Sequence, residues 1–300
     1  MAGIDVVLHQ IIPGLSQHMH VNSAYGGMAD PEFFDYVLAK LAASHAQIQP
    51  RMKGRAMCEV FGAYGWAEGT PMMKYLIDHL LVRGINYFVP HAFSPKYPDP
   101  DCPPHFNANG HNPQFSSFAR LMHYTNQVSH LLSDARPVVD AAILYHAEAE
   151  WSGMPYMLVQ KPARRLYEAQ IDYHILPIDA ILEQGCVEQG ALAIGDMRYS
   201  VLIVPYAAYL PKPFLRKLEA LDAQGLRILF VDGKAEGAGD MGRTIPLEAL
   251  VQTMKQYGLT DGTLPHDFPL LRCAHWVREG LHIWMLVNES KTDAFDGEIQ

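Results

Sequence analysis

One glutamate stands near the end of a strand pattern that is otherwise apolar. The run Arg55 to Gly62 predicts a β-strand in which alternate residues share a face, so Met57, Glu59 and Phe61 lie together. Glutamate is almost never buried without a partner, and Glu59 therefore points to acid–base or nucleophilic chemistry. The alternative is a structural ion pair, for which the chain supplies three nearby cations: Arg51, Lys53 and Arg55.

Two aromatic residues, Tyr64 and Trp66, follow this strand in a glycine-rich loop. Aromatic rings stack on the C–H faces of sugars, while carboxylates handle the hydroxyl groups and the anomeric carbon. A glutamate beside two such rings favours a carbohydrate substrate. The alternative is that both rings pack against the core, as most aromatic side chains do.

The fifteen histidines are unevenly spread, and eleven of them precede position 150. His9 and His91 fall at the ends of two further predicted strands, at the level of Glu59. Uncharged imidazole rings there would donate hydrogen bonds to sugar hydroxyl groups, although an ordinary structural histidine is the alternative for each. His18 and His20 form the only close pair in the sequence, and no H-E-x-x-H motif accompanies them, so no metal site is expected.

These residues are positioned by an alternation of strands, loops and helices. The expected strands are 4–12, 55–62 and 85–93, and the expected helices are 31–46, 71–83 and 115–132. Strands that alternate with helical crossovers run parallel, so their carboxyl ends meet at one edge of the sheet. In parallel α/β barrels the active site gathers at that edge. The long irregular stretch 94–114 is the kind of loop that is usually functional.

A second α/β region begins after a boundary near Asp134. Its expected strands are 138–145, 172–176, 200–205 and 226–232, and its expected helices are 162–170, 178–183 and 212–224. This pattern predicts a doubly wound domain of flavodoxin-like type. Beyond it, the runs 271–277 and 281–288 predict a hairpin with Arg278 to Gly280 at the turn.

The second region lacks the signals of two common chemistries. A glutaminase-like nucleophile elbow needs a cysteine or serine in a turn between strand and helix, but Cys186 follows a short predicted helix instead. No G-x-G-x-x-G motif follows the strand that ends at Tyr145, which argues against dinucleotide binding. We therefore expect no cofactor.

Composition restricts the classes of binding partner and the cellular compartment that we expect for this chain. The chain has 300 residues with a formal net charge of -9 and no Lys/Arg-rich run, which argues against nucleic acid as a partner. Four scattered cysteines without a C-x-x-C pair indicate a reducing compartment. No apolar run approaches the roughly 20 residues that span a bilayer, and no signal-type segment opens the chain. We expect a cytoplasmic protein without membrane contact.

Four segments together resemble large clan A glycoside hydrolases, most of all the α-L-rhamnosidase-like group of family 106. The segments are Glu59 to Trp66, Val82 to Ser94, Pro103 to Phe106 and His111 to Gln114. The order of domains is also similar to that of the family 42 β-galactosidases, in which a TIM barrel precedes a flavodoxin-like domain and a β-sandwich. The resemblance spans roughly positions 4 to 290, and its specific part is 55–150.

By this resemblance, the three strands of the first region are the sixth, seventh and eighth of a barrel. Glu59 takes the place of the carboxylate that is the nucleophile in retaining members and a base in inverting ones, and His91 lines the subsite. The acid/base carboxylate of the clan comes from a fourth strand that has no counterpart in this chain. Glu68, Glu148 and Glu150 are the alternatives for it, although loop carboxylates are usually solvated.

The resemblance and the strand pattern together predict three parts. Residues 1–134 are the C-terminal half of a (β/α)8 TIM barrel, 135–265 a flavodoxin-like α/β domain, and 266–300 the start of a β-sandwich. A sheet of three parallel strands leaves open edges and apolar faces, which predicts a homo-oligomer.

The predicted function is an exo-acting glycoside hydrolase that removes a terminal sugar, such as a β-galactoside, β-glucoside or α-L-rhamnoside. Glu59 is its catalytic carboxylate, and the sugar-binding residues are His9, Tyr64, Trp66 and His91. The alternative is a non-catalytic carbohydrate-binding or oligomerisation fragment of a larger glycosidase.

Overall fold

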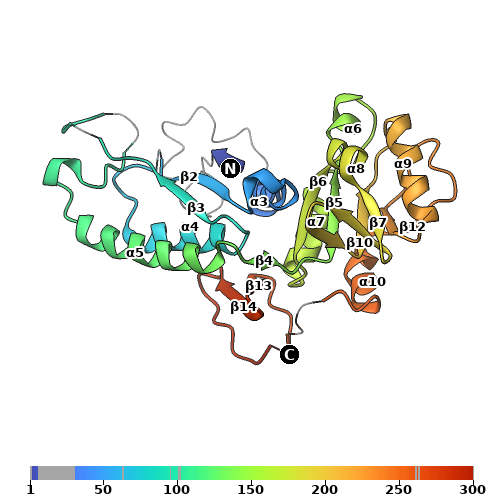
Figure 1. The fold of residues 1–300 in the computed structure, drawn as a ribbon. Coiled ribbons are helices and arrows are strands. Elements are labelled where there is room, and N and C mark those ends of the chain that lie inside the picture. Colours follow the sequence, from blue (N-terminus) through green and yellow to red (C-terminus); the bar gives the residue numbers. More distant parts are fainter. Residues whose placement is uncertain are drawn as a thin grey trace. The chain divides into compact units, whose positions relative to one another are not determined.

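The computed structural model describes the backbone of residues 2–5 and then residues 31–62, 64–94, 96–100, 103–260, 262 and 264–299. The chain divides into two compact units, one made of Met1–Ala46 and Arg51–Ala135 and the other of Gln47–Pro50 and Arg136–Gln300. Figure 1 shows the elements of each unit as ribbons. His9, the His18 and His20 pair and the predicted strand beyond Asp5 lie outside the described residues.

The first unit combines a parallel sheet with helices. Its strands are β1 (Ala2–Asp5), β2 (Ala56–Val60) and β3 (Tyr87–Pro90), in the order β1-β2-β3. Its helices are α2 (Pro31–Phe33), the π-helical η1 (Phe34–Leu38), α3 (Ala39–Ile48), η2 (Pro50–Met52), α4 (Thr70–Leu81), η3 (Ala108–Gly110) and α5 (Phe115–Leu132). Both strand pairings are parallel, which confirms the predicted crossovers.

The two faces of β2 differ in burial. The fully buried residues are Ala56, Cys58 and Val60. Met57 and Glu59, on the opposite face, are partly exposed. Phe61 does not continue that face, because its φ of 79° ends the strand and its side chain is fully buried. The predicted grouping of Phe61 with Glu59 is therefore wrong, since a left-handed backbone turns the chain out of the pleat.

Helix α4 has clear sequence reasons for its bounds. It begins after Gly69 and carries Pro71 in its first turn, where a fixed φ favours the helix. After its end, Gly84 adopts a φ of +96°, and a Cβ at this position would lie 2.9 Å from the Cβ of Ala43 on α3. Both the backbone angle and the close approach of the two segments therefore require glycine.

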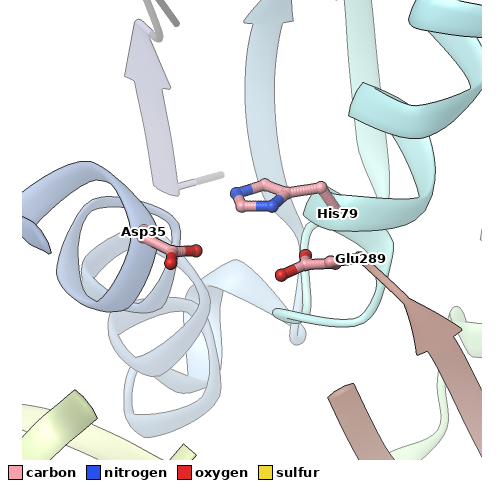
Figure 2. A group of neighbouring side chains, drawn as sticks. All are labelled: Asp35, His79 and Glu289. Carbon is pink, nitrogen blue, oxygen red and sulfur yellow. The ribbon is translucent and has the colours of Figure 1, made fainter. Parts of the chain in front are cut away.

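The buried guanidinium of Arg83 joins two helical segments of the first unit. Its Nη2 pairs with Asp35 Oδ1 at 2.6 Å, and its Nε donates to the backbone oxygen of Asp35 at 2.8 Å. Its Nη1 donates to the carbonyl oxygen of His79 at 2.8 Å. Figure 2 shows Asp35 on η1 and His79 on α4. A charge with a side-chain exposure of 1% is tolerated because these acceptors satisfy it.

The second unit is built on a five-stranded sheet. Its strands are β4 (Arg136–Pro137), β5 (Ala141–Tyr145), β6 (Tyr173–Pro177), β7 (Cys186–Glu188), β8 (Ala191–Ile194), β9 (Met197–Tyr199), β10 (Val201–Pro205), β11 (Arg227–Val231), β12 (Arg243–Ile245), β13 (Leu271–Arg278) and β14 (Leu281–Asn288). Its helices are α6 (Ala147–Trp151), α7 (Gln160–Glu168), α8 (Ile178–Gln184), α9 (Lys212–Ala223), η4 (Leu247–Ala249) and α10 (Leu250–Gln256).

The strand order of this sheet is β12-β11-β10-β5-β6, with every neighbouring pair parallel. Read from β6 and numbered in chain order, that is 2-1-3-4-5, so the order reverses between β5 and β10. Strand β10 is buried over its whole length, as expected for a central strand covered on both faces. The hairpin of β13 and β14 pairs with β4 in a separate antiparallel sheet.

Sequence patterns do not predict the small antiparallel sheet β7-β8-β9. Each of its strands has three or four residues, which is too short for a clear alternation. Its turns are recognisable afterwards, because Gln189, Gly190 and Gly195 all adopt positive φ. Sequence patterns do not predict helices α6 and α10 either, which have five and seven residues.

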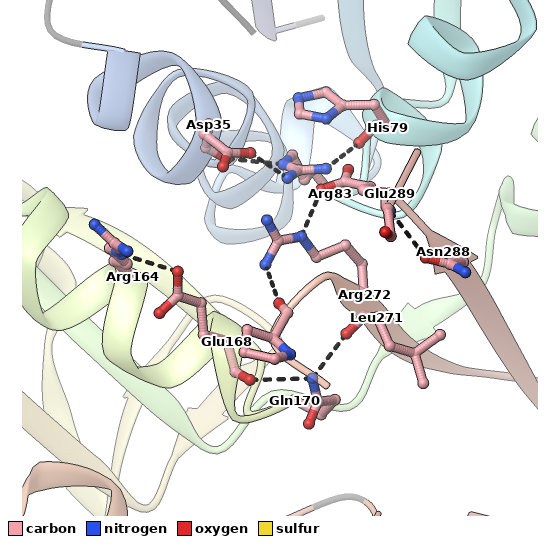
Figure 3. Close-up of polar contacts among 12 residues, drawn as sticks. Asp35, His79, Arg83, Arg164, Glu168, Gln170, Leu271, Arg272, Asn288 and Glu289 are labelled. Atoms are coloured by element: carbon pink, nitrogen blue, oxygen red, sulfur yellow. Dashed lines mark hydrogen bonds and ion pairs between the residues drawn. The ribbon is translucent and has the colours of Figure 1, made fainter. Parts of the chain in front are cut away.

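A second buried ion pair holds the hairpin of the second unit (Figure 3). Arg272 Nε donates to Glu289 Oε2 at 2.6 Å, and the two side chains are 0% and 3% exposed. Gln170, after α7, donates from Nε2 to the carbonyl oxygen of Leu271 at 2.8 Å and to that of Phe268 at 3.2 Å. These bonds tie the end of α7 to the start of β13.

Two findings bear on environment. Within the described residues, none of the helices combines the length and the apolar character that crossing a membrane requires. Cys58 and Cys273 are buried, and Cys186 is exposed.

We predict that Arg83→Met destabilises the first unit by about 3–5 kcal/mol, because it leaves the carboxylate of Asp35 and two carbonyl oxygens without their donor. Hydrogen exchange of the α4 amides measures this loss locally. The matched control is Lys74→Gln, which breaks an i,i+4 ion pair with Asp78 at the surface and should cost less than about 1 kcal/mol. Equal protection of α4 in both variants would contradict the assigned role of Arg83.

Candidate active site

Glu59 occupies the penultimate position of β2. In the parallel register its Cα pairs with that of Asp5 on β1 and that of Val89 on β3. The side chain of Glu59 is partly exposed, so solvent can stabilise its charge. Because the carboxyl ends of parallel strands meet at one edge, the loops after β2 and β3 form the surroundings of this carboxylate.

His91 follows β3 directly and lies against the chain just after β2. Its backbone nitrogen donates to the carbonyl oxygen of Val60 at 2.8 Å, which extends the pairing of the two strands. A Cβ placed on Gly62 would lie 3.4 Å from Cγ of the His91 ring. The backbone at Gly62 and the His91 ring are therefore close neighbours. His91 and Glu59 stand at the same edge of the sheet.

The loop that follows β2 buries one predicted aromatic ring and exposes the other. Tyr64 is 3% exposed, whereas Trp66 is 49% exposed. The Trp66 ring meets the ring of His105 edge-on, with centroids 5.7 Å apart. Gly65 donates from its backbone nitrogen to the carbonyl oxygen of Pro103 at 2.9 Å, which joins this loop to the segment that holds His105.

Phenylalanine packing holds the loops after β2 and β3 in place. Phe106 is fully buried, and its ring stacks on that of Phe118 of α5 with centroids 4.1 Å apart. The rings of Phe61 and Phe93, which follow β2 and β3, also contact the ring of Phe106, with centroid distances of 5.8 and 5.4 Å. The loops are therefore anchored on the unit's own core, which makes the positions of their polar side chains definite.

Two amide side chains of the segment 111–114 fix the backbone of the neighbouring loops. Gln114 Oε1 accepts a hydrogen bond from the backbone nitrogen of Thr70 at 3.2 Å, at the start of α4. Asn112 Nδ2 donates to the carbonyl oxygen of His105 at 3.0 Å, and Asn112 Oδ1 accepts from the Gln114 nitrogen at 2.9 Å. These bonds fix the backbone at His105.

Glu68 is the residue whose environment differs most from the expectation for a loop carboxylate. We expected it to be solvated, but it is 2% exposed, and neither carboxylate oxygen has a hydrogen-bond partner among the described residues. Burial raises the pKa of the Glu68 carboxyl to about 9. Such a group keeps its proton at neutral pH and can act as an acid.

Other polar groups in these two loops are also buried. Nδ1 of His91 and both ring nitrogens of His105 have no hydrogen-bond partner among the described residues. The pKa of the Tyr64 hydroxyl is raised by burial and then by the carboxyl of Glu68 and the thiol of Cys58, so these groups share one neighbourhood. Buried polar groups are normally paired, and exceptions concentrate where a protein binds or reacts.

Two of these residues are hard to find from sequence. His105 lies in the segment Pro103 to Phe106, which resembles family 106 without indicating a role for this histidine, and Glu68 is one of three alternatives for the acid/base carboxylate. Their burial depends on packing against the distant helix α5, which a local pattern does not encode. Glu148 and Glu150, the other carboxylates considered from sequence, lie on α6 in the second unit.

Two solved structures share the fold of this chain. A rhamnosidase from Novosphingobium sp. PP1Y is similar with a TM-score of 0.62 and 19% identity, over 85% of this chain and 28% of that protein. A beta-galactosidase from Bacillus circulans sp. alkalophilus is similar with a TM-score of 0.61 and 13% identity, over 87% of this chain and 53% of that protein. Both are mixed α/β folds with parallel sheets and helices, and this chain spans about half of their length or less.

No curated protein matches the sequence. The model of glycoside hydrolase family 106, described as alpha-L-rhamnosidase, matches residues 18–246. Because this match covers well over half of the 300 residues, the chain belongs to glycoside hydrolase family 106.

Proposed function

We propose that the protein is an exo-acting glycoside hydrolase that removes a terminal sugar, and that its site lies at the carboxyl ends of β2 and β3. The observation that carries this proposal is a group of buried polar atoms of Glu68, His91 and His105 that have no hydrogen-bond partner among the described residues, in loops that also hold an exposed tryptophan. Among the sugars considered, the family description favours an α-L-rhamnoside over a β-galactoside or β-glucoside.

The two glutamates of the site differ in environment, and we assign them different roles. Glu59 has access to solvent and is the carboxylate that attacks the anomeric carbon or activates water. Glu68 is protonated because it is buried, and it supplies the acid that protonates the leaving oxygen. Trp66 offers its exposed ring face to the sugar, while Tyr64 and His91 fix the polar surroundings.

We infer a finer architecture from the strand orders. The first unit corresponds to the last three strands of a TIM barrel, with the domain ending near residue 134. The strand order 2-1-3-4-5 supports a flavodoxin-like second domain over 135–265, and the hairpin of β13 and β14 supports the start of a β-sandwich over 266–300. The edges of β1 and β3 support association into a homo-oligomer.

Glu59→Gln should lower kcat/KM for glycoside hydrolysis by about 100-fold or more, because the amide can neither attack carbon nor accept a proton from water. A panel of nitrophenyl glycosides, including the α-L-rhamnoside, measures the loss. The matched control is Asp134→Asn, which removes one charge from an exposed turn after α5 and should leave the rate unchanged. Activity that survives Glu59→Gln contradicts the assignment. No hydrolysis of any glycoside by the unaltered chain favours the non-catalytic carbohydrate-binding alternative.

Glu68→Gln should slow the cleavage of alkyl glycosides by about 100-fold or more, because an alkoxide needs a proton to leave. Nitrophenyl glycosides should lose far less, because nitrophenolate leaves without help. For the unaltered protein, kcat/KM on alkyl glycosides should fall as pH rises through about 9, and this fall should be missing in the variant. An equal loss on both substrate classes would mean that Glu68 only supports the fold.

The pH dependence of the free energy of unfolding is an independent test of the burial of Glu68. The ordinary pKa is 4.5 and the folded value is about 9, so the folded state holds the extra proton between these two values. This contribution to the free energy of unfolding is fully present below pH 4.5 and is lost as pH rises to about 9. Glu68→Gln should therefore remove a decline of at most about 1.4 kcal/mol per pH unit, measured by urea unfolding at several pH values. Parallel pH profiles for both proteins would contradict the burial of an ionisable group.

A further inference from the structure

A cavity of about 510 Å³ opens on the second unit, whereas the residues assigned to hydrolysis belong to the first. Its size is in the range of sites that take one small organic ligand. It is lined by Met154, Ala208, Tyr209, Leu210, Lys212, Leu215, Arg216, Glu236 and Gly237.

The cavity lies where the topology of the sheet favours a ligand. Its lining comes from the segments that follow β5, β10 and β11, all beyond the carboxyl ends of parallel strands. The strand order reverses between β5 and β10, which are two of these three strands. In open parallel sheets, ligands bind beyond the carboxyl ends at this switch point, because the connecting segments diverge to opposite faces there.

Backbone hydrogen bonds fix the segments that form the cavity. Met157 donates to the carbonyl oxygen of Tyr206 at 2.7 Å, and Ala208 donates to that of Pro155 at 2.8 Å. Glu236 donates from its backbone nitrogen to the carbonyl oxygen of Ala208 at 3.1 Å. The three segments are thus bonded to one another, and the cavity is formed before any ligand arrives.

Part of the lining of the cavity is apolar. Leu210 and Leu215 line it and are 2% and 8% exposed. Met154 and Tyr209 are each 41% exposed, so a thioether and an aromatic ring remain open to a ligand. A phenol ring presented in this way can stack on the C–H face of a sugar.

The lining of the cavity also includes two cations. Lys212 and Arg216 stand four residues apart on α9 and both line the cavity. Neither side chain forms an ion pair or hydrogen bond with any described residue, in contrast to Arg164, which pairs with Glu168 at 2.8 Å. Like charges at this spacing destabilise a helix slightly, and an anion between them reverses that effect. Glu236 adds an acceptor for hydroxyl groups.

We propose that this cavity binds an acidic saccharide, with the sugar carboxylate at Lys212 and Arg216 and its C–H face on Tyr209. The positive charge selects the carboxylate, the open ring selects the sugar face, and Glu236 accepts from a hydroxyl group. The choice of a sugar, rather than another small carboxylate, rests on the proposed glycosidase function. The site would give the protein a means of binding an acidic glycan that is independent of the residues assigned to hydrolysis.

Isothermal titration calorimetry with free galacturonate and glucuronate tests the proposal on the full chain, with galactose and glucose as the neutral counterparts. The acids should bind and the neutral sugars should bind about tenfold more weakly or not at all. The double variant Lys212→Gln, Arg216→Gln should weaken acid binding about tenfold or more, and Tyr209→Ala should weaken it as well. Raising the salt concentration should weaken the binding of both acids to the unaltered protein.

The matched control is Lys217→Gln, which removes a charge from the same helix at a position that does not line the cavity. It should leave binding unchanged. Tyr209, Lys212 and Arg216 are exposed, so the variants at these positions should fold. Equal affinity for acids and neutral sugars, undiminished binding by the double variant, or no binding by the unaltered protein overturns the proposal. Competition by inorganic phosphate as strong as that by galacturonate overturns its saccharide part. Glu59→Gln should bind the acids normally, which separates this site from the proposed function.

Discussion

Parallel pairing of β1, β2 and β3 is the constraint on which the proposed active site depends. It brings the carboxyl ends of the strands to one edge, so residues that follow different strands become neighbours. Glu59 near the end of β2 and His91 just after β3 stand at the same edge of the sheet for this reason, although 31 positions lie between them in the sequence. The helices between the strands supply the core that keeps the pairing, and Arg83 locks two of their segments together.

The chemistry of the site follows from how tightly its loops are packed. A carboxylate in an open loop is ionised and solvated, whereas Glu68 lies in a loop held by Phe61, Phe106 and Phe118. Aromatic packing thus favours the protonated form of this carboxyl group, because burial is the cause of its raised pKa. Glu59, on the partly exposed face of β2, keeps the solvent access that Glu68 lacks. Two residues of one type therefore suit opposite roles in acid–base chemistry.

Sequence periodicity predicts the long elements well and the packing-dependent features poorly. The helix over 115–132 and the hairpin of β13 and β14 are predicted within a residue, because their apolar spacing is sustained over many positions. The strands β7, β8 and β9 are too short for such a signal. The face of Phe61 is predicted wrongly because one left-handed residue ends the alternation. The positions of Glu59, His91 and Trp66 are predictable from strand ends, while His105 reaches the site only through tertiary contacts of its loop.

The same geometric rule places a second site on the other unit, but with the opposite chemistry. In both units the polar side chains lie beyond the carboxyl ends of parallel strands, where segments diverge and leave room. The first unit holds carboxyl and imidazole groups, to which we assign proton transfer in the proposed function. The second gathers Lys212 and Arg216, whose positive charge at neutral pH suits them to hold an anion rather than to exchange protons. A chain with an overall charge of -9 repels acidic glycans at long range, so unpaired cations in one cavity give such a glycan a defined point of attachment.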